Sequence, residues 1–411
     1  MKTAVRTVRL RLAEPLRISR STMTARDAVW FTVEHGGLRG HGEAVASAYY
    51  GLDADTLTRL LTEAGTRLEH CPDPETALDA LREDGFPWTG ADRGAGAGVP
   101  GAVVAAVESA LLDLAGKRAG APVHRLLGSF APPCAPTART IGITTTERAA
   151  VLAHCLAESG FTLLKAKAGA PDPEDDLARV RAIRDHAPHV RLLLDPNGAW
   201  TPEQALRLLP RFAELGVEAV EQPLAPGDPE ALARLAETAP LPVIADEDAV
   251  TFEDARRLAG RVHGVNVKLA KCGGVHAALR IAELLAGTGT ELMLGCLTAS
   301  SLGIAPAVHL AGRARWADLD GHLLLAHDPW TGIGGTDGTV RASDRAGLGV
   351  RPAPEESAPE ESAPEESARD GSAPEGTVPG GSARDGAAVP DRSTRSAHPT
   401  HPERPQRADV A

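Results

Sequence analysis

TLLKAKAG (162–169) opens the stretch that decides the fold, and LLLDPNGAW (192–200), VEQPL (220–224) and IADED (244–248) follow it. Each fragment begins with the short apolar run of a buried strand and carries charged residues at or near the end of that run. Eight such strands are predicted, at 138–144, 162–167, 191–195, 218–221, 241–245, 264–269, 291–294 and 316–320. Amphipathic segments such as 173–186 and 201–212 separate them and are expected to be helices. This alternation predicts a TIM-type α/β barrel, and a doubly wound sheet is disfavoured because no glycine-rich phosphate motif follows the first strand.

Three carboxylates stand at the ends of neighbouring predicted strands. Asp195, Glu221 and Asp246 are separated by one strand–helix unit each. The carboxyl ends of barrel strands meet at one mouth, so these side chains are expected to converge there. With no histidine or cysteine beside them, they form a hard oxygen site suited to Mg²⁺ or Mn²⁺. The alternative is that each acid only caps the helix after it. That explanation is adequate for one acid but weaker for three acids that stand in register at successive strand ends.

The lysines of this chain are few and concentrated. Only six of the 43 basic residues are lysines, and four of them lie in two short apolar segments, at 165, 167, 268 and 271. Arginine effectively never deprotonates, whereas a lysine with a lowered pKa can act as a base. Lys165 and Lys167 are two apart on a strand, so they share a face and are expected to lower each other's pKa. The competing interpretation is that these lysines are chance survivors at exposed strand ends.

The two ends of the chain differ from the barrel. Residues 1–125 combine strand-like segments with helical patterns at 53–68 and 101–120, which predicts an α+β domain. Pro15 to Arg26 and Ser47 to Leu52 are expected to be loops that could close over the mouth. From Pro352 onward the chain repeats APEES three times and has no aromatic residue. That composition predicts a disordered tail.

Composition excludes several classes of protein. No apolar run approaches the roughly 18 residues of a membrane span, and the first twelve residues, which alternate apolar with basic, do not resemble a signal peptide. A cytoplasmic protein without a membrane partner is therefore expected. A net charge of −12 argues against nucleic-acid binding. The five cysteines are scattered without CxxC spacing, which predicts reduced thiols and no zinc site.

The ordered set of motifs resembles the enolase superfamily, and within it the muconate-lactonizing subgroup. The resemblance extends from residue 1 to about 351 and rests on GHGEA (40–44), LLGSF (126–130), KAKAG (165–169), LDPNGAW (194–200), VEQPL (220–224), ADED (245–248) and VKLAKCGG (267–274). The segment DLDGHLLLAHDPWTGIGG (318–335) is similar to the aspartate-x-aspartate signature of dipeptide epimerases, the L-Ala-D/L-Glu epimerase group.

The resemblance implies a fold and a set of roles. The fold would be a (β/α)₇β barrel at 126–320 with an α+β capping domain at 1–125, completed by residues 321–351, and the disordered tail would occupy 352–411. Mg²⁺, with Mn²⁺ as a possible substitute, would be bound by Asp195, Glu221 and Asp246, with Asn197 and Glu247 close by. Lys167 and Lys268 would be the acid/base pair, and Lys165 would assist electrostatically. Asp318 and Asp320 would hold the α-ammonium group of a dipeptide, and Thr140 would contact the substrate.

The implied reaction inverts the α-carbon of the C-terminal residue of a dipeptide by two-base 1,1-proton transfer through an enediolate. Alternatives are an N-acylamino acid racemase, an o-succinylbenzoate synthase, a cycloisomerase, or a metal-binding scaffold without turnover. One departure from the family pattern is Ala299, where a glutamate is usual after the seventh strand. The partner expected is a small-molecule dipeptide, and a homo-oligomer is compatible with the sequence. Arg17, Arg20 and Met23 could face the second residue of the dipeptide, whose side chain the sequence leaves open.

Overall fold

The barrel consists of eight parallel strands that lie side by side in chain order. The computed structural model describes residues 1–83 and 99–354, so the predicted tail lies outside the described residues from 355 onward. All eight sequence-predicted strands form, as β5(Arg139–Ile141), β6(Leu163–Lys167), β7(Arg191–Asp195), β8(Val217–Glu221), β9(Val243–Ala245), β10(Gly264–Lys268), β11(Glu291–Gly295) and β12(Trp316–Asp318). The first and last strands approach each other, because the Ala138 amide donates to the Ala317 carbonyl at 2.8 Å. The predicted barrel is therefore confirmed.

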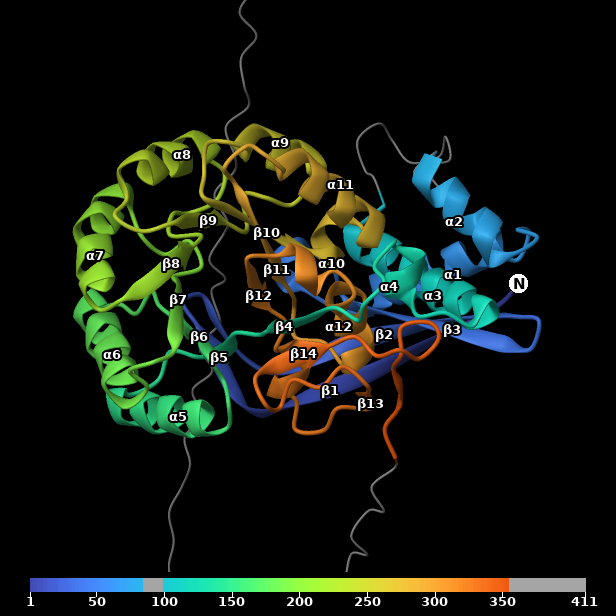
Figure 1. Ribbon diagram of the computed structural model, residues 1–411, viewed down its shortest axis with the longest axis horizontal. Helices are drawn as coiled ribbons and strands as arrows, with labels where there is room; N and C mark the ends of the chain where they lie inside the picture. Colours follow the sequence, from blue (N-terminus) through green and yellow to red (C-terminus); the bar gives the residue numbers. More distant parts are fainter. Residues whose placement is uncertain (84–98, 355–411) are drawn as a thin grey trace, which may run out of the picture. The chain divides into compact units, whose positions relative to one another are not determined.

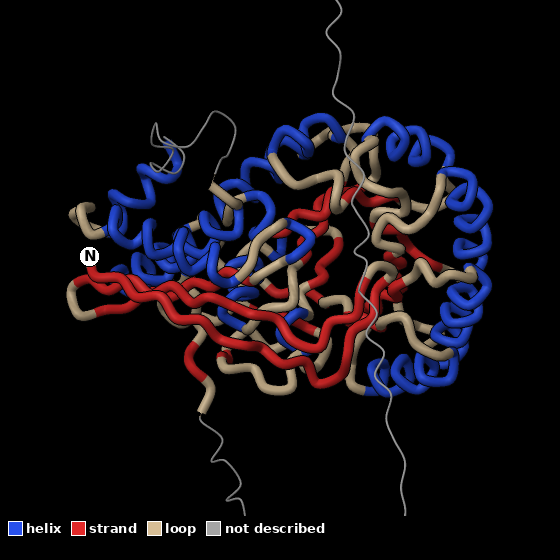
Figure 2. Tube along the Cα trace, turned by 180° about the vertical axis from the view of Figure 1, so that it is seen from behind, coloured by secondary structure: helices blue, strands red, loops and turns tan. Residues whose placement is uncertain are grey.

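Helices surround the sheet (Figures 1 and 2). They are α5(Thr146–Glu158), α6(Pro173–His186), α7(Pro202–Glu214), α8(Pro229–Thr238), α9(Phe252–Leu258), α10(Leu269–Cys272), α11(Val275–Leu285) and α12(Ser301–Val308). The sequence contains the signals that start these helices. Asp172 and Thr201 cap α6 and α7 through their side chains, and a proline at the first helical position follows each cap. This is why the helices predicted from residue 173 and from residue 201 form where expected.

The barrel interior has a floor of apolar side chains. Ala138, Leu163, Leu193, Ala219, Ile244, Met293 and Trp316 form one buried cluster, and each is at most 1% exposed. Because side chains alternate across a strand, the residue two positions further along each strand points to the same side. Those next residues are Thr140, Lys165, Asp195, Glu221, Asp246, Gly295 and Asp318. A polar layer thus lies directly above the apolar floor, toward the mouth.

A second region covers the mouth from the N-terminal part of the chain. Its sheet is antiparallel and contains β1(Lys2–Ile18), β2(Ser21–His35) and β3(Leu38–Val45), and α1(Ala54–Leu68), α2(Pro74–Glu83) and α3(Gly101–Ala119) accompany it. The prediction of a loop at Pro15–Arg26 is wrong. Cross-strand pairing continues to the tip, with Leu16 opposite Met23 and Ile18 opposite Ser21, so backbone hydrogen bonds hold this segment as a hairpin despite its polar composition. Ser47–Leu52 contains a short 3₁₀ helix, η1(Ala48–Tyr50).

The last described residues pack on this N-terminal region. Leu12 bridges Leu325, and the ring of Trp30 meets Trp330 edge-on at 5.6 Å between centroids. These contacts suit a cap that residues after 320 complete. The remaining elements are α4(Val123–Leu126), β4(Cys134–Pro136), η2(Ala311–Arg313), η3(Gly321–Leu324), β13(Trp330–Thr331), β14(Thr339–Arg341) and β15(Arg351–Pro352).

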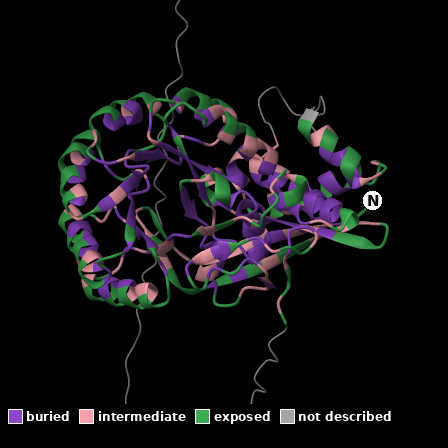
Figure 3. Cartoon of the chain, in the orientation of Figure 1, coloured by how far each residue is buried: buried purple, intermediate pink, exposed green. Residues whose placement is uncertain are grey.

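The outer helices have a buried side and an exposed side (Figure 3). On α7, Ala205, Leu208, Leu209 and Phe212 are buried, while Leu206 is 53% exposed. The helices therefore present one apolar stripe to the sheet and a polar face outward. Within the residues that the structure describes, no helix has the length and apolar character required to cross a membrane.

The floor predicts a strong effect on stability. Leu193→Ala should lower the free energy of unfolding by about 2–5 kcal/mol, because it opens a cavity beneath the polar layer. Leu206→Ala, the same chemical change on the exposed face of α7, should stay within about 0.5 kcal/mol of the parent. Equilibrium denaturant unfolding measures both. Equal effects of the two substitutions would show that the floor is not a packed core.

Candidate active site

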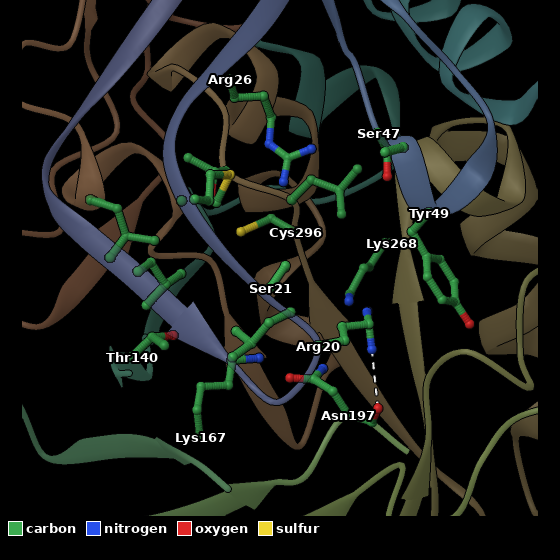
Figure 4. A pocket seen from close by; sticks show the side chains of 18 of the residues that line it. Arg20, Ser21, Arg26, Ser47, Tyr49, Thr140, Lys167, Asn197, Lys268 and Cys296 are labelled. Carbon is green, nitrogen blue, oxygen red and sulfur yellow. Dashed lines mark hydrogen bonds between the residues drawn. The ribbon is translucent and has the colours of Figure 1, made fainter. Parts of the chain in front are cut away.

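All nine sequence-predicted site residues come together around one cavity at the carboxyl ends of the barrel strands. The cavity has a volume of about 390 Å³, and six of the nine line it directly: Thr140, Lys165, Lys167, Lys268, Asp318 and Asp320. The carboxylates Asp195, Glu221 and Asp246 lie in the polar layer beneath and contact those lysines. Figure 4 shows the cavity, with Lys167, Lys268 and Thr140 among its labelled residues.

The three carboxylates are buried and paired with lysines. Asp195 Oδ2 lies 2.5 Å from Lys167 Nζ and 2.9 Å from Lys165 Nζ. Lys165 Nζ also contacts Glu221 Oε2 at 2.5 Å. Lys268 Nζ donates to Asp246 Oδ2 at 2.6 Å. Each carboxylate is at most 1% exposed, so water does not solvate these charges and the lysine ammonium groups compensate them instead.

Two further side chains hold this layer, and sequence reasoning gave neither of them a role there. Lys271 donates to both the carboxylate and the carbonyl of Asp246, the latter at 2.7 Å. Asn266 Nδ2 donates to Glu221 Oε1 at 2.8 Å. Asn266 lies two residues before Lys268 on β10, so the alternation that revealed the lysine pair could also have revealed this amide.

The pKa values of the lysines are not set by their mutual repulsion alone. Burial by itself would lower the pKa of Lys165, but Asp195, Asp318 and Glu221 outweigh it and raise that pKa well above the usual value. Burial likewise opposes the effect of Asp246 and Glu221 on Lys268, and the pKa of Lys268 is also raised. The expectation that Lys165 and Lys167 lower each other's pKa is therefore wrong for Lys165. Three carboxylates in contact have a larger effect on it than one neighbouring ammonium group.

The pKa of Glu221 is shifted in the opposite direction to those of the two aspartates. Burial, reinforced by Asp195, raises the pKa of Glu221 to about 7 against the opposing effect of Lys165. In contrast, lysines overcome burial at Asp195 and Asp246 and hold both pKa values well below the usual range. The three pKa shifts thus differ in direction within one layer, and a cation bound beside Glu221 would favour its ionised form.

The chemistry of these donors fits a hard divalent cation. In the described part of the chain no three carboxylate, imidazole or thiolate groups converge on one point as they stand. Lysine ammonium groups contact all three carboxylates instead. Asn197 Oδ1 and Glu247 Oε2 are buried beside the layer, and neither oxygen accepts a hydrogen bond from any residue that the structure describes. These oxygens, together with the three carboxylates, are ligands and supports of the kind that Mg²⁺ takes.

Asp318 ends β12, Asp320 follows two residues later, and both line the wall of the cavity at that strand. Asp318 Oδ2 accepts from Lys165 Nζ at 2.8 Å, while its buried Oδ1 has no hydrogen-bond partner within residues 1–83 and 99–354. Asp320 Oδ2 accepts from the backbone amide of Thr140 at 2.7 Å and from Arg139 at 3.2 Å. Thr140 thus positions Asp320 through its backbone. The two acids leave acceptor capacity at the cavity.

The hairpin tip and the segment around η1 cover the mouth. Arg20 Nη2 contacts Glu247 Oε1 at 2.8 Å, and its Nη1 donates to the Asn197 carbonyl at 3.1 Å (Figure 4). The same guanidinium lies 4.4 Å from the centroid of the Tyr49 ring. Met23 and Tyr50 line the cavity as well, whereas Arg17 lines a separate groove beside β5 and α5. The two segments predicted to cover the mouth do so, although the first is a hairpin.

Ala299 leaves room that a side chain from the N-terminal sheet uses. Ala299 is buried, and next to it Glu43 of β3 accepts from the Ser300 amide at 2.8 Å and from the Ser300 hydroxyl. Trp30 Nε1 also donates to this carboxylate at 2.8 Å. The GHGEA motif contained Glu43, but nothing in the sequence showed that it reaches the loop after β11. The hydrogen bonding of that loop therefore depends on the cap.

Family models match most of the described chain. The N-terminal domain model of the mandelate racemase/muconate lactonizing enzyme family matches residues 1–128, and the enolase C-terminal domain-like model matches residues 147–357. The chain belongs to the enolase superfamily. The resemblance predicted from the motifs is thereby confirmed, as is the barrel with its antiparallel capping domain.

Individual relatives extend along nearly the whole described chain. A hydrophobic dipeptide epimerase from Roseobacter litoralis is 33% identical over 352 residues, which are 85% of this chain and 98% of the relative. An L-Ala-D/L-Glu epimerase from Bacteroides thetaiotaomicron is 30% identical over 345 residues, or 83% of this chain and 85% of the relative. The crystal structure of a dipeptide epimerase from Enterococcus faecalis, complexed with Mg and L-Leu-L-Tyr, is 30% identical, with a TM-score of 0.78 over 85% of this chain and 98% of that one.

Glu43 generates a pH prediction. Burial raises its pKa from 4.5 to about 7, against opposing hydrogen bonds from Ser300 and Trp30. Between these values the folded protein holds a proton that the unfolded chain releases, so this contribution to stability is lost as pH rises toward 7. Glu43→Gln cannot lose it. The stability of the variant relative to the parent should therefore rise between pH 5 and pH 7, by at most about 1.4 kcal/mol per pH unit, and then level off.

Denaturant unfolding at a series of pH values measures this difference. Glu34→Gln, which alters a carboxylate on the rim of the same sheet, is the matched control and should give a flat difference between pH 5 and pH 8. Parallel curves for the parent and Glu43→Gln would show that Glu43 ionises normally.

Proposed function

We propose that this protein is a Mg²⁺-dependent dipeptide epimerase that inverts the α-carbon of the second residue by two-base 1,1-proton transfer. The observation that carries the proposal is the position of two lysines. Lys167 ends β6 and Lys268 ends β10, four strands apart in a barrel of eight, so they line one cavity from opposite walls. The relatives named as dipeptide epimerases, one of them complexed with Mg and a dipeptide, support it.

The proton on the α-carbon of a carboxylate is only feebly acidic, so the developing enediolate needs positive charge close by. A divalent cation held by Asp195, Glu221 and Asp246 would supply Lewis-acid stabilisation of the substrate carboxylate. Lys165 adds a fixed charge. Its side chain is 2% exposed, and its ammonium group contacts Asp195, Glu221 and Asp318, which favour the protonated form.

The two lysines exchange roles with the direction of reaction. One lysine, deprotonated, removes the α-proton from one face, and the other, protonated, delivers a proton to the opposite face. For Lys268 to act as the base, its contact with Asp246 must give way to substrate, because Asp246 favours the ammonium form. Arginine at either place would keep the charge but could not release the proton.

The acid pair on the wall of β12 selects a substrate with a free amine. Asp318 Oδ1 is buried, receives no hydrogen bond in the described part of the chain, and can accept from an α-ammonium group. N-acylamino acids, o-succinylbenzoate precursors and muconate-type substrates have no such group, so they would leave this oxygen unpaired. A dipeptide is therefore the substrate class that the cavity fits best.

The proposal includes the domain division predicted from the sequence, with a cap at 1–125 and 321–351 around a barrel at 126–320. A cytoplasmic location and a homo-oligomeric assembly also belong to it.

Chelation should remove the activity. Excess EDTA should abolish epimerisation, and Mg²⁺ or Mn²⁺ should restore it, because the three carboxylates offer only hard oxygen donors. Asp195→Asn should raise the Mg²⁺ concentration for half-maximal activity by about tenfold or more. Asp185→Asn, on the outer helix α6, is the control and should leave that concentration unchanged. Full activity in EDTA would contradict the metal assignment.

The lysine pair should give separable partial reactions. Lys268→Ala should lower epimerisation by about 10²–10⁴-fold while Lys167 still exchanges the α-proton of one epimer with D₂O. Lys167→Ala should leave exchange of the other epimer only. The double variant should be scarcely slower than either single variant, since the residues act as a unit. Proton NMR of each purified epimer in D₂O measures both exchange and epimerisation for each variant.

Lys2→Ala, on the rim of the N-terminal sheet, is the matched control and should retain the parent rate. Near-parent epimerisation by either alanine variant of the pair would refute the two-base assignment. Exchange of both epimers by a single remaining lysine would indicate one base.

A further inference from the structure

Arg26 brings a guanidinium into the cavity from β2, and the roles described so far do not use it (Figure 4). Its Nη1 donates to the Ala46 carbonyl. Its Nε is buried without a hydrogen-bond partner, and Nη2 meets no acceptor among the described residues. Most of the donor capacity of this side chain is therefore unused.

Arg26 also lacks an acidic partner, unlike the other cations of the cavity. Arg20 contacts Glu247, and Lys165, Lys167 and Lys268 contact the carboxylates of the polar layer. The neighbouring Asp27 is paired with Arg9 on the opposite strand at 3.0 Å. Among the described residues no ion pair is formed by Arg26. Arg26 is half-buried, so water only partly solvates its guanidinium, and an incoming anion would supply the missing counter-charge.

The place of Arg26 in the cavity indicates which anion could reach it. Arg26 and Arg20 lie at opposite ends of the cavity in Figure 4, and Cys296 at the end of β11 lies near Arg26. The thiol of Cys296 is in turn close enough to Asp318 and Asp320 to feel their charge. Arg26 therefore lies on the side of the acid pair, away from Asn197 and Lys167.

We propose that Arg26 binds a side-chain carboxylate on the first residue of the dipeptide, so that the substrates begin with aspartate or glutamate. This inference rests on the proposed function, which places the α-ammonium group at Asp318 and Asp320. The first residue then lies on the wall of β11 and β12, and its side chain is the part of the substrate nearest to Arg26. A planar guanidinium with free N–H groups is suited to a bidentate contact with that carboxylate.

A purely structural role would need less. The bond to the Ala46 carbonyl joins the ends of β2 and β3, which are already paired in register from Ala28 and Val45 onward. A single N–H group is enough for that bond. A structural role would also affect every substrate equally, whereas an anion site distinguishes a carboxylate from its amide.

The test compares isosteric dipeptides by deuterium exchange at the α-carbon of the second residue in D₂O. The holoenzyme with Mg²⁺ should show kcat/KM at least about tenfold higher for L-Glu-L-Ala than for L-Gln-L-Ala, and for L-Asp-L-Ala than for L-Asn-L-Ala. Arg26→Gln should bring both ratios close to one, mainly by raising KM for the acidic dipeptides. Arg26→Lys should recover part of the preference. Arg17→Gln, on the same hairpin but outside this cavity, is the matched control and should keep the parent ratios.

Each outcome decides a different point. Equal rates for the acidic dipeptides and their amides in the parent protein would overturn the inference, as would an unchanged ratio in Arg26→Gln. Preference for L-Ala-L-Glu over L-Glu-L-Ala would overturn the assignment to the first residue. Exchange of no dipeptide at all would instead refute the proposed function. Turnover of L-Gln-L-Ala reports whether Arg26→Gln is folded, and if it is not, the comparison in the parent protein alone settles the substrate class.

Discussion

The alternation of side chains along the barrel strands is the constraint on which the site depends. Six of the seven residues of the apolar floor are followed two positions later by a polar residue of the layer above, so that Leu163 precedes Lys165, Leu193 precedes Asp195 and Ala219 precedes Glu221. One further step reaches the rim, where Lys167 lies. Packing of the floor thus fixes the height and direction of the charges above it, and the same strands supply both stability and chemistry.

The polar layer is stable because opposite charges are buried together. Lys165 contacts three carboxylates with its side chain 2% exposed, and removal of one partner would leave buried charge without compensation. The pKa of Glu221 is raised to about 7. A cation bound beside Glu221 would favour its ionised form and, through the cation, the binding of a substrate carboxylate.

Sequence reasoning predicted the parts of the structure that depend on local periodicity. The eight strands, the helix starts and the convergence of the lysines and acids at the strand ends follow from alternation and spacing, whereas Thr140 was predicted from the resemblance alone. Sequence reasoning failed mainly where the structure depends on contacts between different segments of the chain. The Pro15–Arg26 hairpin is held by cross-strand pairing, Glu43 reaches Ser300 from the N-terminal sheet, and the pKa of Lys165 is set by acids on three other strands. Glu43 and Ser300, and Lys165 and its acids, are far apart in the sequence, so no local pattern could reveal those contacts. The paired residues of the hairpin are close in the sequence, but their polar composition is that of a loop.

The N-terminal sheet contributes to the chemistry as well as covering it, because Arg20 ties the hairpin to Glu247 and Arg26 brings an unpaired cation to the cavity. The central claim remains that two lysines act on opposite faces of one carbon. It is tested most directly by the isotopic content of the first product formed from an unlabelled L,L-dipeptide in D₂O by the parent enzyme. Delivery of solvent deuterium by the second lysine predicts a product epimer that is fully deuterated at the α-carbon from the earliest turnovers. Protium carried from substrate into that early product would mean that one lysine serves both faces, and would contradict the account.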